Sequence, residues 1–470
     1  MKLAYSLRAH WRQALFFGAY LMVLLICFAR DITWVNTNTD SAGFISFVAA
    51  DNPWYFAPVY YATGKLAVAF PLGTVAARMI FLQGVLPAFG SVVLVYLAIR
   101  KQTNNEWAPW VGSAVLAGCA IFFSQAIVTE LYVLTAFFLI LGYTLLLYHK
   151  ASLAALSLGL GFGVHYLTSV PAIVALFFWS RELRRRWYVL AGSMGIPYAL
   201  QAIFLFPLGD WDTFYNQVGR GYTSASPDIF VSDLAPRLVN VIKVLIVSFS
   251  LALIPAVLWL KERKNLQFAF IVVVPLTYFI VSISICSYVQ LVAAAPFVAV
   301  AAGLGVKRLR MKHFAPLCLA SSLILMLLMP LKYDIGRSLD ETPTTMRQLM
   351  NQFDRLPDSS IIVGYREYEG ISDTCGIQVV ALVQYYNWES GRHLRYVNLD
   401  FLDPRWEANR QEMRDQGIEI PYPIEDYIGD GYFWLEVIKA VAKVNAPTPV
   451  YYVRVTGKEI SKCEIVQAQW

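Results

Sequence analysis

Long apolar segments alternate with short polar gaps from the N-terminus to about residue 331 of the chain. As a helix, a segment of roughly 20 apolar residues crosses the hydrocarbon core of a membrane. The region 151–180 is longer, and His165 interrupts it. We divide it into two short crossings, because one long span would place Lys150 and Arg184 on opposite faces. The pattern predicts eleven transmembrane helices, at 13–29, 74–99, 107–126, 128–148, 151–164, 166–180, 187–206, 238–260, 266–284, 287–306 and 314–331.

Basic residues gather in every second gap between these segments. An excess of Lys and Arg marks cytoplasmic loops of membrane proteins. We therefore expect the N-terminus in the cytoplasm, and we expect the acidic gaps and the C-terminal region outside it. The basic gaps are 1–12, 100–106, 149–150, 181–186, 261–265 and 307–313.

Composition favours an integral membrane protein. Hydrophobic residues make up 57% of the 470 residues and charged residues only 15%, whereas soluble domains carry about 25% charged residues. Residues 1–334 hold 24 basic and 12 acidic side chains. Most of these basic residues are expected to face anionic lipid, so nucleic acid is not a predicted partner. No cleavage site follows the first span, which should remain as an anchor.

The chain changes character after Lys332, and residues 335–470 are expected to form a soluble extracytoplasmic α/β domain. Strands are predicted at 361–363, 396–399 and 449–455, and helices at 344–353, 376–387, 404–416 and 433–444. Strands that alternate with helices are typical of α/β domains. Cys375 and Cys463 could pair there, although their spacing does not require it. No metal-ligand cluster and no glycine-rich phosphate loop is visible, so neither a metal nor another cofactor is predicted.

The first domain, 1–334, has two outer loops longer than a turn, 30–73 and 207–237. Asp40 lies about ten residues after the first span, where partial burial could raise its pKa toward the range of a general base. An Asp before small residues could equally cap a helix. Aromatic side chains that suit contacts with sugar rings follow, at Trp54, Tyr55 and Tyr60.

Two ionisable residues lie at outer joins between predicted spans. Glu130 falls between 107–126 and 128–148; it is either functional, as intramembrane ionisable residues often are, or simply solvated at a turn. His165 either contacts a phosphate or marks the turn between its two spans. Basic residues are rare on the outer side, where an anionic ligand near lipid would need them. They are Lys65, Arg78, Arg220, Arg237 and Lys243, of which Arg78 and Lys243 could instead reach lipid headgroups.

Most of these residues belong to four short motifs. They are Asp40-Ser41, the set Pro58, Tyr60, Gly64 and Lys65, the segment Ser124–Tyr132, and the segment Gly163–Thr168. Together with Leu356-Pro357 and Arg395–Leu399 in the tail, they resemble the GT-C superfamily of membrane glycosyltransferases. The most similar branch is an uncharacterised-domain family related to the plexin protein O-mannosyltransferase. The chain departs from that family at Ala42-Gly43, where the family has Gly-Glu, and at Pro53–Phe56, where it has His-Pro-Pro-Gly.

The resemblance implies a GT-C fold and an inverting transfer of a hexose or pentose from a polyprenyl-phosphate donor to an acceptor hydroxyl, on a protein or an envelope glycan. It implies that Asp40 is the general base and that Glu130 is a second catalytic residue. Phosphate contacts would come from His165, Lys65, Arg220 and Arg237, and sugar or acceptor contacts from Trp54, Tyr55 and Tyr60. The bacterial likeness of the tail favours a prokaryotic plasma membrane.

Two alternatives stay open. A transporter or lipid flippase would also be polytopic, but ion-coupled transporters place ionisable groups near the bilayer midplane. In this chain, the ionisable residues lie at the ends of the predicted spans. An inactive relative that binds glycans would fit the altered motifs of the first outer loop.

Overall fold

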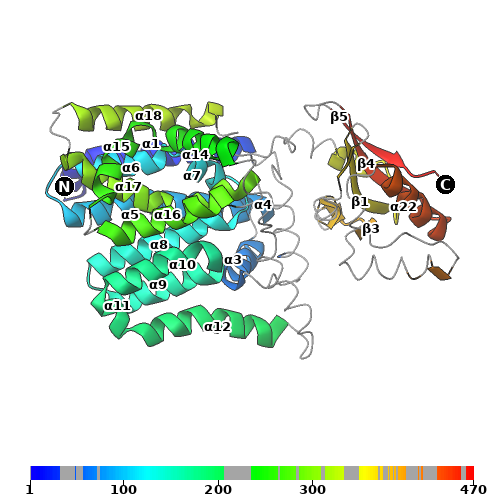
Figure 1. Cartoon of the computed structure of the whole chain (residues 1–470), viewed down its shortest axis with the longest axis horizontal. Coiled ribbons are helices and arrows are strands. Elements are labelled where there is room, and N and C mark those ends of the chain that lie inside the picture. Colours follow the sequence, from blue (N-terminus) through cyan, green and yellow to red (C-terminus); the bar gives the residue numbers. More distant parts are fainter. Residues whose placement is uncertain are drawn as a thin grey trace. The chain divides into compact units, whose positions relative to one another are not determined.

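The structure is a computed structural model, and its elements are labelled in Figure 1. It describes residues 2–31, 48, 57–70, 75–205, 234–262, 265–281, 285–308, 313–332, 349–368, 371–373, 379, 382–384, 386–387, 390–398, 411, 414–415, 431–456 and 462–469. The chain divides into two compact units. The first consists of residues 1–33 and 53–336, and the second of residues 34–52 and 337–470. The extracytoplasmic position of the second unit stays a prediction.

The first unit is helical. Its α-helices are α1 (Lys2–Asp31), α3 (Pro58–Ala69), α4 (Val75–Met79), α5 (Leu86–Gln102), α6 (Trp107–Ala117), α7 (Ala120–Ala126), α8 (Leu131–Leu147), α9 (Ala151–Val164), α10 (Tyr166–Trp179), α11 (Arg181–Arg185), α12 (Trp187–Leu205), α14 (Leu234–Phe249), α15 (Leu253–Leu260), α16 (Leu266–Val281), α17 (Ala295–Gly305) and α18 (Phe314–Lys332). A π-helix, η1 (Ile80–Val85), joins α4 to α5, and 3₁₀ segments lie at η3 (Ser250–Ala252), η5 (Ile285–Val292) and η6 (Val306–Arg308).

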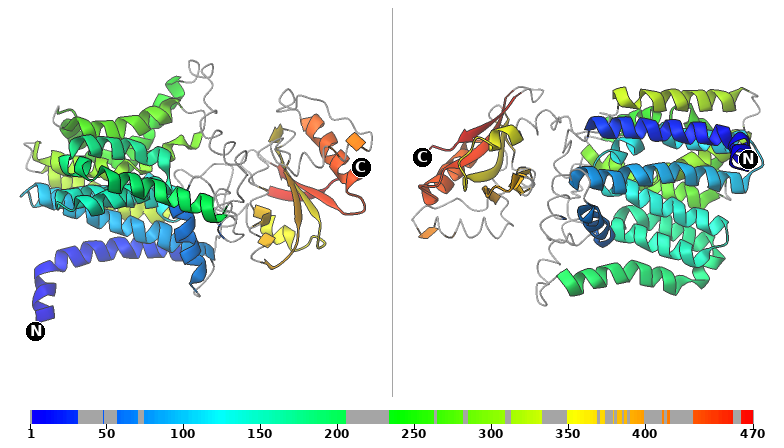
Figure 2. Two further views of the ribbon diagram at one scale, coloured as in Figure 1. Left: turned by 90° about the horizontal axis from the view of Figure 1, so that it is seen from below. Right: turned by 180° about the vertical axis from the view of Figure 1, so that it is seen from behind.

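Three of the helices form consecutive hairpins. Helix α8 turns at Tyr148–Lys150 into α9, which packs along it. Helix α9 ends at Val164, and α10 runs back from Tyr166 beside it (Figures 1 and 2). The two helices predicted on either side of His165 are therefore present. Because consecutive helices run in opposite directions, Glu130 and His165 lie at one end of these hairpins, and His149 and Arg181 lie at the other.

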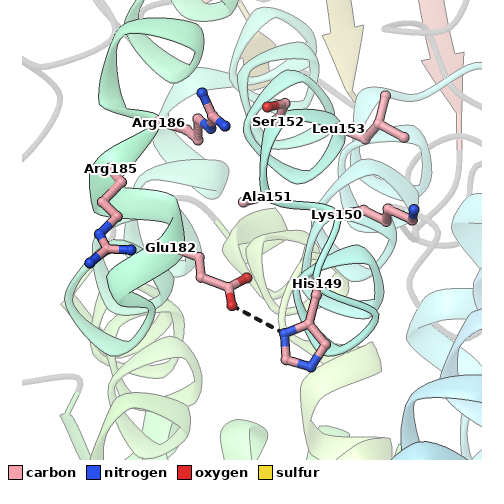
Figure 3. A pocket seen from close by; sticks show the side chains of 8 residues that line it. All are labelled: His149, Lys150, Ala151, Ser152, Leu153, Glu182, Arg185 and Arg186. Carbon is pink, nitrogen blue, oxygen red and sulfur yellow. Dashed lines mark hydrogen bonds and ion pairs between the residues drawn. The ribbon is translucent and has the colours of Figure 1, made fainter.

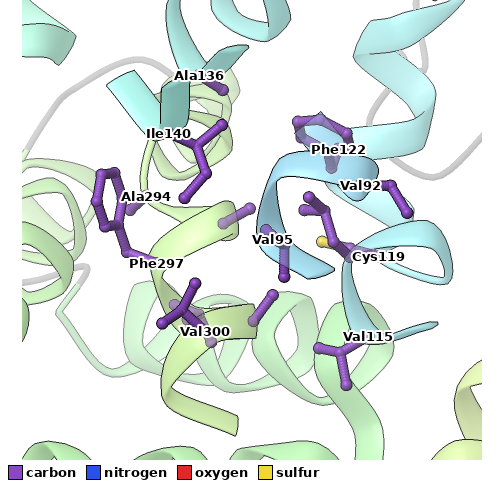
Figure 4. Packing of buried hydrophobic residues seen from close by; sticks show 14 of the residues in the cluster. Val92, Val95, Val115, Cys119, Phe122, Ala136, Ile140, Ala294, Phe297 and Val300 are labelled. Carbon is purple, nitrogen blue, oxygen red and sulfur yellow. The ribbon is translucent and has the colours of Figure 1, made fainter. Parts of the chain in front are cut away.

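The centre of the first unit is filled by apolar side chains from helices that are distant in sequence. Helix α17 packs against α15, α6 and α5, and its side chains meet those of α8. Figure 4 shows Phe297 and Ala294 beside Ile140, with Val95 and Phe122 nearby. All five side chains are buried. These contacts join the first and last thirds of the helical unit into one core.

Three helices among the described residues are long and apolar enough to cross a membrane, at Trp11–Ala29, Val75–Gln102 and Val241–Leu260. A fourth crossing results if α6 and α7 are counted as one. Shorter apolar helices lie at Leu131–Leu147, Ala151–Val164, Tyr166–Trp179, Leu266–Tyr278, Ala295–Gly305 and Phe314–Leu328. The first unit thus has the character of an integral membrane domain, and the predicted number of eleven crossings stays a prediction.

The predicted span 107–126 is not one straight helix. It breaks after Ala117, and α6 and α7 are bent by 59°. Gly118 closes α6, and Cys119 is extended before α7 begins. A Cβ on Gly118 would lie 2.4 Å from the Ser322 carbonyl oxygen. At the bend, Gly118 therefore lies in close backbone contact with α18, which the apolar sequence pattern does not reveal.

The second unit contains a five-stranded mixed sheet. Its strands are β1 (Ile361–Tyr368), β2 (Ile371–Asp373), β3 (Arg395–Asn398), β4 (Val450–Thr456) and β5 (Lys462–Gln467). Strand β1 is parallel to β3 and β4, whereas β2 and β5 are antiparallel additions at the edges. Helix α22 (Gly431–Val444) covers one face through Trp434 and Val441, and a second apolar cluster around Phe353 covers the other.

This arrangement agrees with the α/β domain expected from the sequence. The predicted strands at 361–363, 396–399 and 449–455 and the helix at 433–444 are all present within a residue or two, and β1 is longer than expected. Most of the predicted helix 404–416 lies outside the described residues, as does Cys375, so its pairing with Cys463 stays a prediction.

The π-helix lies directly against α7, and this contact is testable. A Cβ on Gly84 would lie 2.2 Å from the Ala126 carbonyl oxygen. Gly84→Ala should therefore destabilise the protein by about 1–3 kcal/mol through overpacking. Gly195→Ala in α12 is the control, because nothing lies within 4 Å of that position and Ala favours a helix. Thermal unfolding in detergent should show a lower midpoint for Gly84→Ala only, and equal midpoints would contradict the contact.

Candidate functional site

Four of the predicted site residues are described with their side chains: Glu130, His165, Tyr60 and Lys65. All four lie at one end of the first unit, which we call the outer end because the charge pattern predicts it to be extracytoplasmic. Arg237 lies in the first turn of α14, and its side chain is not described. Asp40, Trp54, Tyr55 and Arg220 lie outside the described residues.

Glu130 is buried at the start of α8. It occupies the N-cap position with an extended backbone, and its side chain makes no capping hydrogen bond. Only 5% of the residue is exposed, and every residue from Ser124 to Glu130 is buried. The alternative that Glu130 is a solvated turn residue is therefore wrong. A buried carboxylate is costly, so Glu130 stays a candidate for the predicted functional role.

The Tyr60 phenol lies within electrostatic reach of Glu130. Tyr60 belongs to α3, a short helix of the outer loop, and is only 2% exposed. Its burial and the nearby Glu130 charge both raise the pKa of Tyr60 well above its usual value. The phenol therefore stays protonated at neutral pH and can act as a hydrogen-bond donor. A predicted sugar-contact residue and a predicted catalytic residue are brought together here.

Gln83 fixes α3 to the bundle, and the sequence analysis did not identify it. Its Nε2 donates to the Tyr60 carbonyl oxygen and to Thr63 Oγ1, both at 2.8 Å. Gln83 is completely buried and lies in the π-helix η1. Single π-turns inside α-helices are common at functional sites. The only signal in the sequence was an amide within the apolar run 74–99.

Two amide oxygens at the outer end have no hydrogen-bond partner among the described residues. They are Oε1 of Gln83 and Oε1 of Gln125, both buried. Gln125 precedes the Glu130 turn, and Gly84 beside Gln83 touches the backbone of Ala126. Buried polar atoms are nearly always paired. These two acceptors are therefore candidates to bind a hydroxyl group of a ligand.

His165 joins α9 to α10 and caps the second helix. Its Nδ1 accepts a hydrogen bond from the Thr168 backbone N–H at 3.3 Å. Burial lowers the pKa of His165 to about 4, so the ring is neutral at pH 7. Because Nδ1 is the acceptor, the neutral ring carries its proton on Nε2. His165 does mark the turn between its helices, and it also retains a donor.

The outer-end residues are held by close contacts between their elements. The Tyr132 and His165 rings are 5.4 Å apart, which connects the start of α8 to the α9–α10 turn. A Cβ on Gly163 would lie 2.5 Å from Val59 Cγ2, so α3 lies directly on the end of α9. The motifs that begin at Pro58, Ser124 and Gly163 are therefore neighbours in space.

The described cations of the outer side differ in their surroundings. Lys65 Nζ lies 5.6 Å from the Tyr61 ring centroid, on the same helix as Tyr60. Arg78 Nη1 donates to the Val68 carbonyl oxygen near the end of α3, at 3.0 Å. Lys243 is exposed on α14. Lys65 thus places a positive charge on the helix that carries Tyr60, whereas the Arg78 side chain contacts the backbone of that helix.

Comparison with known proteins shows a shared fold. No protein-family model matches the chain, and no curated protein matches it. ArnT from Cupriavidus metallidurans in the apo state has a TM-score of 0.54 and 12% identity, over 95% of this chain and 93% of that chain. The same protein bound to undecaprenyl phosphate has a TM-score of 0.52 and 10% identity, over 97% and 98%.

A weaker likeness, with a TM-score of 0.45 and 12% identity, relates the chain to the oligosaccharyltransferase of Archaeoglobus fulgidus in the apo form. It covers 92% of this chain and 69% of that chain. The likeness to ArnT shows that the two proteins share a fold. The GT-C superfamily that the sequence resemblance implied, and the relation to the plexin O-mannosyltransferase, stay predictions.

The cap formed by His165 predicts different effects for two substitutions. His165→Ala removes the acceptor for the Thr168 N–H and should cost about 1 kcal/mol, whereas His165→Asn keeps a good N-cap. The unfolded ring binds a proton below about pH 6.5, but the folded ring does so only near pH 4. Stability should therefore fall as the pH drops through this window.

Thermal unfolding in detergent between pH 4 and 7 measures both effects. His165→Asn should unfold near the wild-type temperature at pH 7 and should lose the part of the acid dependence that His165 causes. Equal destabilisation by Ala and Asn would contradict the capping role.

Proposed function

We propose that the protein is a membrane glycosyltransferase, which moves a sugar from a polyprenyl-phosphate donor to an acceptor hydroxyl on the extracytoplasmic face. The observation that supports this most is the gathering of three motif segments at the outer end of a GT-C-like fold. Each segment contributes one polar group to it: Tyr60 and Glu130, which are buried, and His165, which is half-buried. The ArnT structure named as bound to undecaprenyl phosphate supports a polyprenyl-phosphate donor.

In the proposed reaction, Asp40 takes the proton of the acceptor hydroxyl. The acceptor oxygen then forms a bond to the anomeric carbon from the face opposite the phosphate, which inverts the configuration. The bond between the anomeric carbon and the phosphate oxygen breaks, and its electron pair stays with the polyprenyl phosphate. Because phosphate is a good leaving group, positioning and charge stabilisation should contribute most of the rate.

The described residues fit this reaction as binding and positioning groups. Lys65 neutralises part of the phosphate charge, and the Nε2–H of His165 donates to a phosphate oxygen. The protonated phenol of Tyr60 and the carboxylate of Glu130 hold hydroxyl groups of the sugar or acceptor. Arg220 and Arg237 are proposed as further phosphate contacts, and Trp54 and Tyr55 as sugar or acceptor contacts.

The position of the ionisable groups argues against an ion-coupled transporter. Such proteins use charged groups near the bilayer midplane. Glu130 and His165 instead lie at helix ends, next to breaks in the chain. A lipid flippase or an inactive glycan-binding relative remains an outcome that the following experiments distinguish.

The first test concerns Asp40. Asp40→Asn should lower the turnover number by about 10²–10⁴-fold, because general-base catalysis contributes a factor of this size. Purified protein is given a polyprenyl-phosphate hexose or pentose and cell-envelope acceptors, and transfer of labelled sugar is measured. Asp358→Asn, an exposed change in the second unit, is the control.

Full activity in Asp40→Asn would show that Asp40 is not the general base. Lipid or solute movement without sugar transfer supports a flippase or transporter, and glycan binding alone supports an inactive relative.

The second test separates the charge of Glu130 from its place in the fold. Gln has nearly the same shape as Glu and keeps one side-chain oxygen acceptor, so Glu130→Gln should fold normally and lower the turnover number by about 10²-fold, because a hydrogen bond from a hydroxyl to a charged carboxylate is stronger than one to an amide. Glu106→Gln is a matched control, because Glu106 is an exposed N-cap residue of α6, also without a side-chain capping bond. Equal activity of the two variants would remove Glu130 from the site.

A further inference from the structure

Charged side chains at the α8–α9 turn surround a surface hollow of about 610 Å³. Figure 3 shows Lys150 and Arg185 extending to opposite sides of it, and His149 Nδ1 lies 3.1 Å from Glu182 Oε1. Since the cations of this hollow are exposed and point apart, it presents no single anion site. A contact in the second unit differs, because there one side chain, that of Gln352, meets two backbone groups at once.

The side-chain amide of Gln352 bridges two backbone groups of strand β5. Its Nε2 donates to the Cys463 carbonyl oxygen at 2.6 Å, and its Oε1 accepts from the Ile465 N–H at 2.7 Å. Because a carbonyl only accepts and an N–H only donates, these two partners fix the orientation of the amide. Gln352 lies in the helical residues 349–353, where the neighbouring Phe353 packs into the apolar cluster on the sheet. The amide is thus held against the strand from a buried base.

Both bridged groups lie on the outer edge of β5. In an antiparallel pair, the backbone groups of successive residues point alternately toward the neighbouring strand and away from it. The Ala468 N–H donates to the Val450 carbonyl oxygen, so the even-numbered residues of this segment face β4 and the odd-numbered ones face outward. Among the described strands, β5 pairs with β4 alone. Gln352 therefore occupies positions that a further strand would use.

Strand β5 is the edge strand of this sheet that is best able to pair with another chain. It has 6 residues, whereas β2 has 3 and β3 has 4. Its sequence, Lys-Cys-Glu-Ile-Val-Gln, has one basic and one acidic residue and neither Pro nor Gly, which is typical of segments that form intermolecular sheets. Exposed edges recruit other strands unless they are short, bulged, charged or covered. A cover near the middle of β5 removes this hazard.

We propose that Gln352 keeps the edge of β5 closed to β5 of a second copy of this chain. Two identical strands can pair antiparallel about a two-fold axis, because the same edge serves both copies. A register centred on Ile465 places Glu464 of one copy opposite Val466 of the other, whereas a register centred on Glu464 would place two like charges opposite each other. The Ile465-centred pair needs the Ile465 N–H, which Gln352 holds.

The first experiment compares self-association of the purified full-length protein in detergent, by size-exclusion chromatography with light scattering over a range of concentrations. Gln352→Ala should dimerise about 10-fold more tightly than the wild type, because the strand edge no longer has to give up its internal hydrogen bonds. Gln411→Ala is the matched control. It removes an exposed amide of the same unit that contacts Asp415 instead of a strand, and it should behave as the wild type does.

A cysteine at the two-fold position tests the register. Directly opposite residues of a hydrogen-bonded antiparallel pair have their Cα atoms about 5.5 Å apart, which a disulfide can span. Ile465→Cys should therefore form an intermolecular disulfide under mild oxidation when combined with Gln352→Ala, and about 10-fold less when Gln352 is present. Gln352→Ala alone shows whether the native cysteines contribute. Equal cross-linking in both backgrounds, or a dimer that does not cross-link at this position, overturns the proposal.

Gln352→Glu serves if Gln352→Ala unfolds. It keeps the size of the side chain and the acceptor for the Ile465 N–H, but at pH 7 it cannot donate to the Cys463 carbonyl oxygen. It should also dimerise more tightly than the wild type. Self-association that stays unchanged in a folded Gln352 variant, or that rises equally in Gln411→Ala, shows that Gln352 does not guard the edge.

Discussion

The buried amide of Gln83 is the interaction on which the outer end of the protein depends. It satisfies a carbonyl and a hydroxyl of α3 at the same time, both at 2.8 Å, in surroundings where water cannot replace it. An unpaired polar group there would cost the full desolvation penalty. Helix α3 carries Tyr60 and Lys65, so Gln83, with the contacts of Arg78 to Val68 and of Gly163 to Val59, sets where these two proposed ligand contacts lie.

The polar residues of the outer end all lie where regular helix is interrupted. A helix interior satisfies its own backbone groups and leaves only its side chains to contact a ligand, whereas a helix terminus also presents backbone donors or acceptors. Glu130 begins α8, His165 separates α9 from α10, and Gln83 lies in a π-turn. All three positions are irregular, and all three lie at the same end of otherwise regular apolar helices. The bilayer tolerates irregular backbone only where protein or water covers it, so such a cluster favours a site.

Part of this arrangement could be predicted from the sequence. The alternation of basic gaps required a break near His165, and the structure has it. A short apolar run at 361–363 also predicted the start of β1, and β4 was expected at 449–455. The break at Gly118 and the role of Gln83 could not be predicted, because a helix buried on all sides has no polar face that reveals its register. Strand β5 was missed, since its residues Lys462–Gln467 are partly polar and its pairing with β4 is a tertiary contact.

The π-turn has a consequence for how this protein can change. A π-turn differs from regular helix by about one extra residue, and each residue of an α-helix rotates the chain by about 100°. A chain one residue shorter between Met79 and Leu86 would therefore swing Gln83 to another side of its helix and leave α3 without its anchor. Most side-chain replacements in this stretch preserve that geometry. Apart from Gly84, where a Cβ would meet the Ala126 carbonyl oxygen, natural variation around Gln83 should accordingly be freer in amino-acid type than in the number of residues.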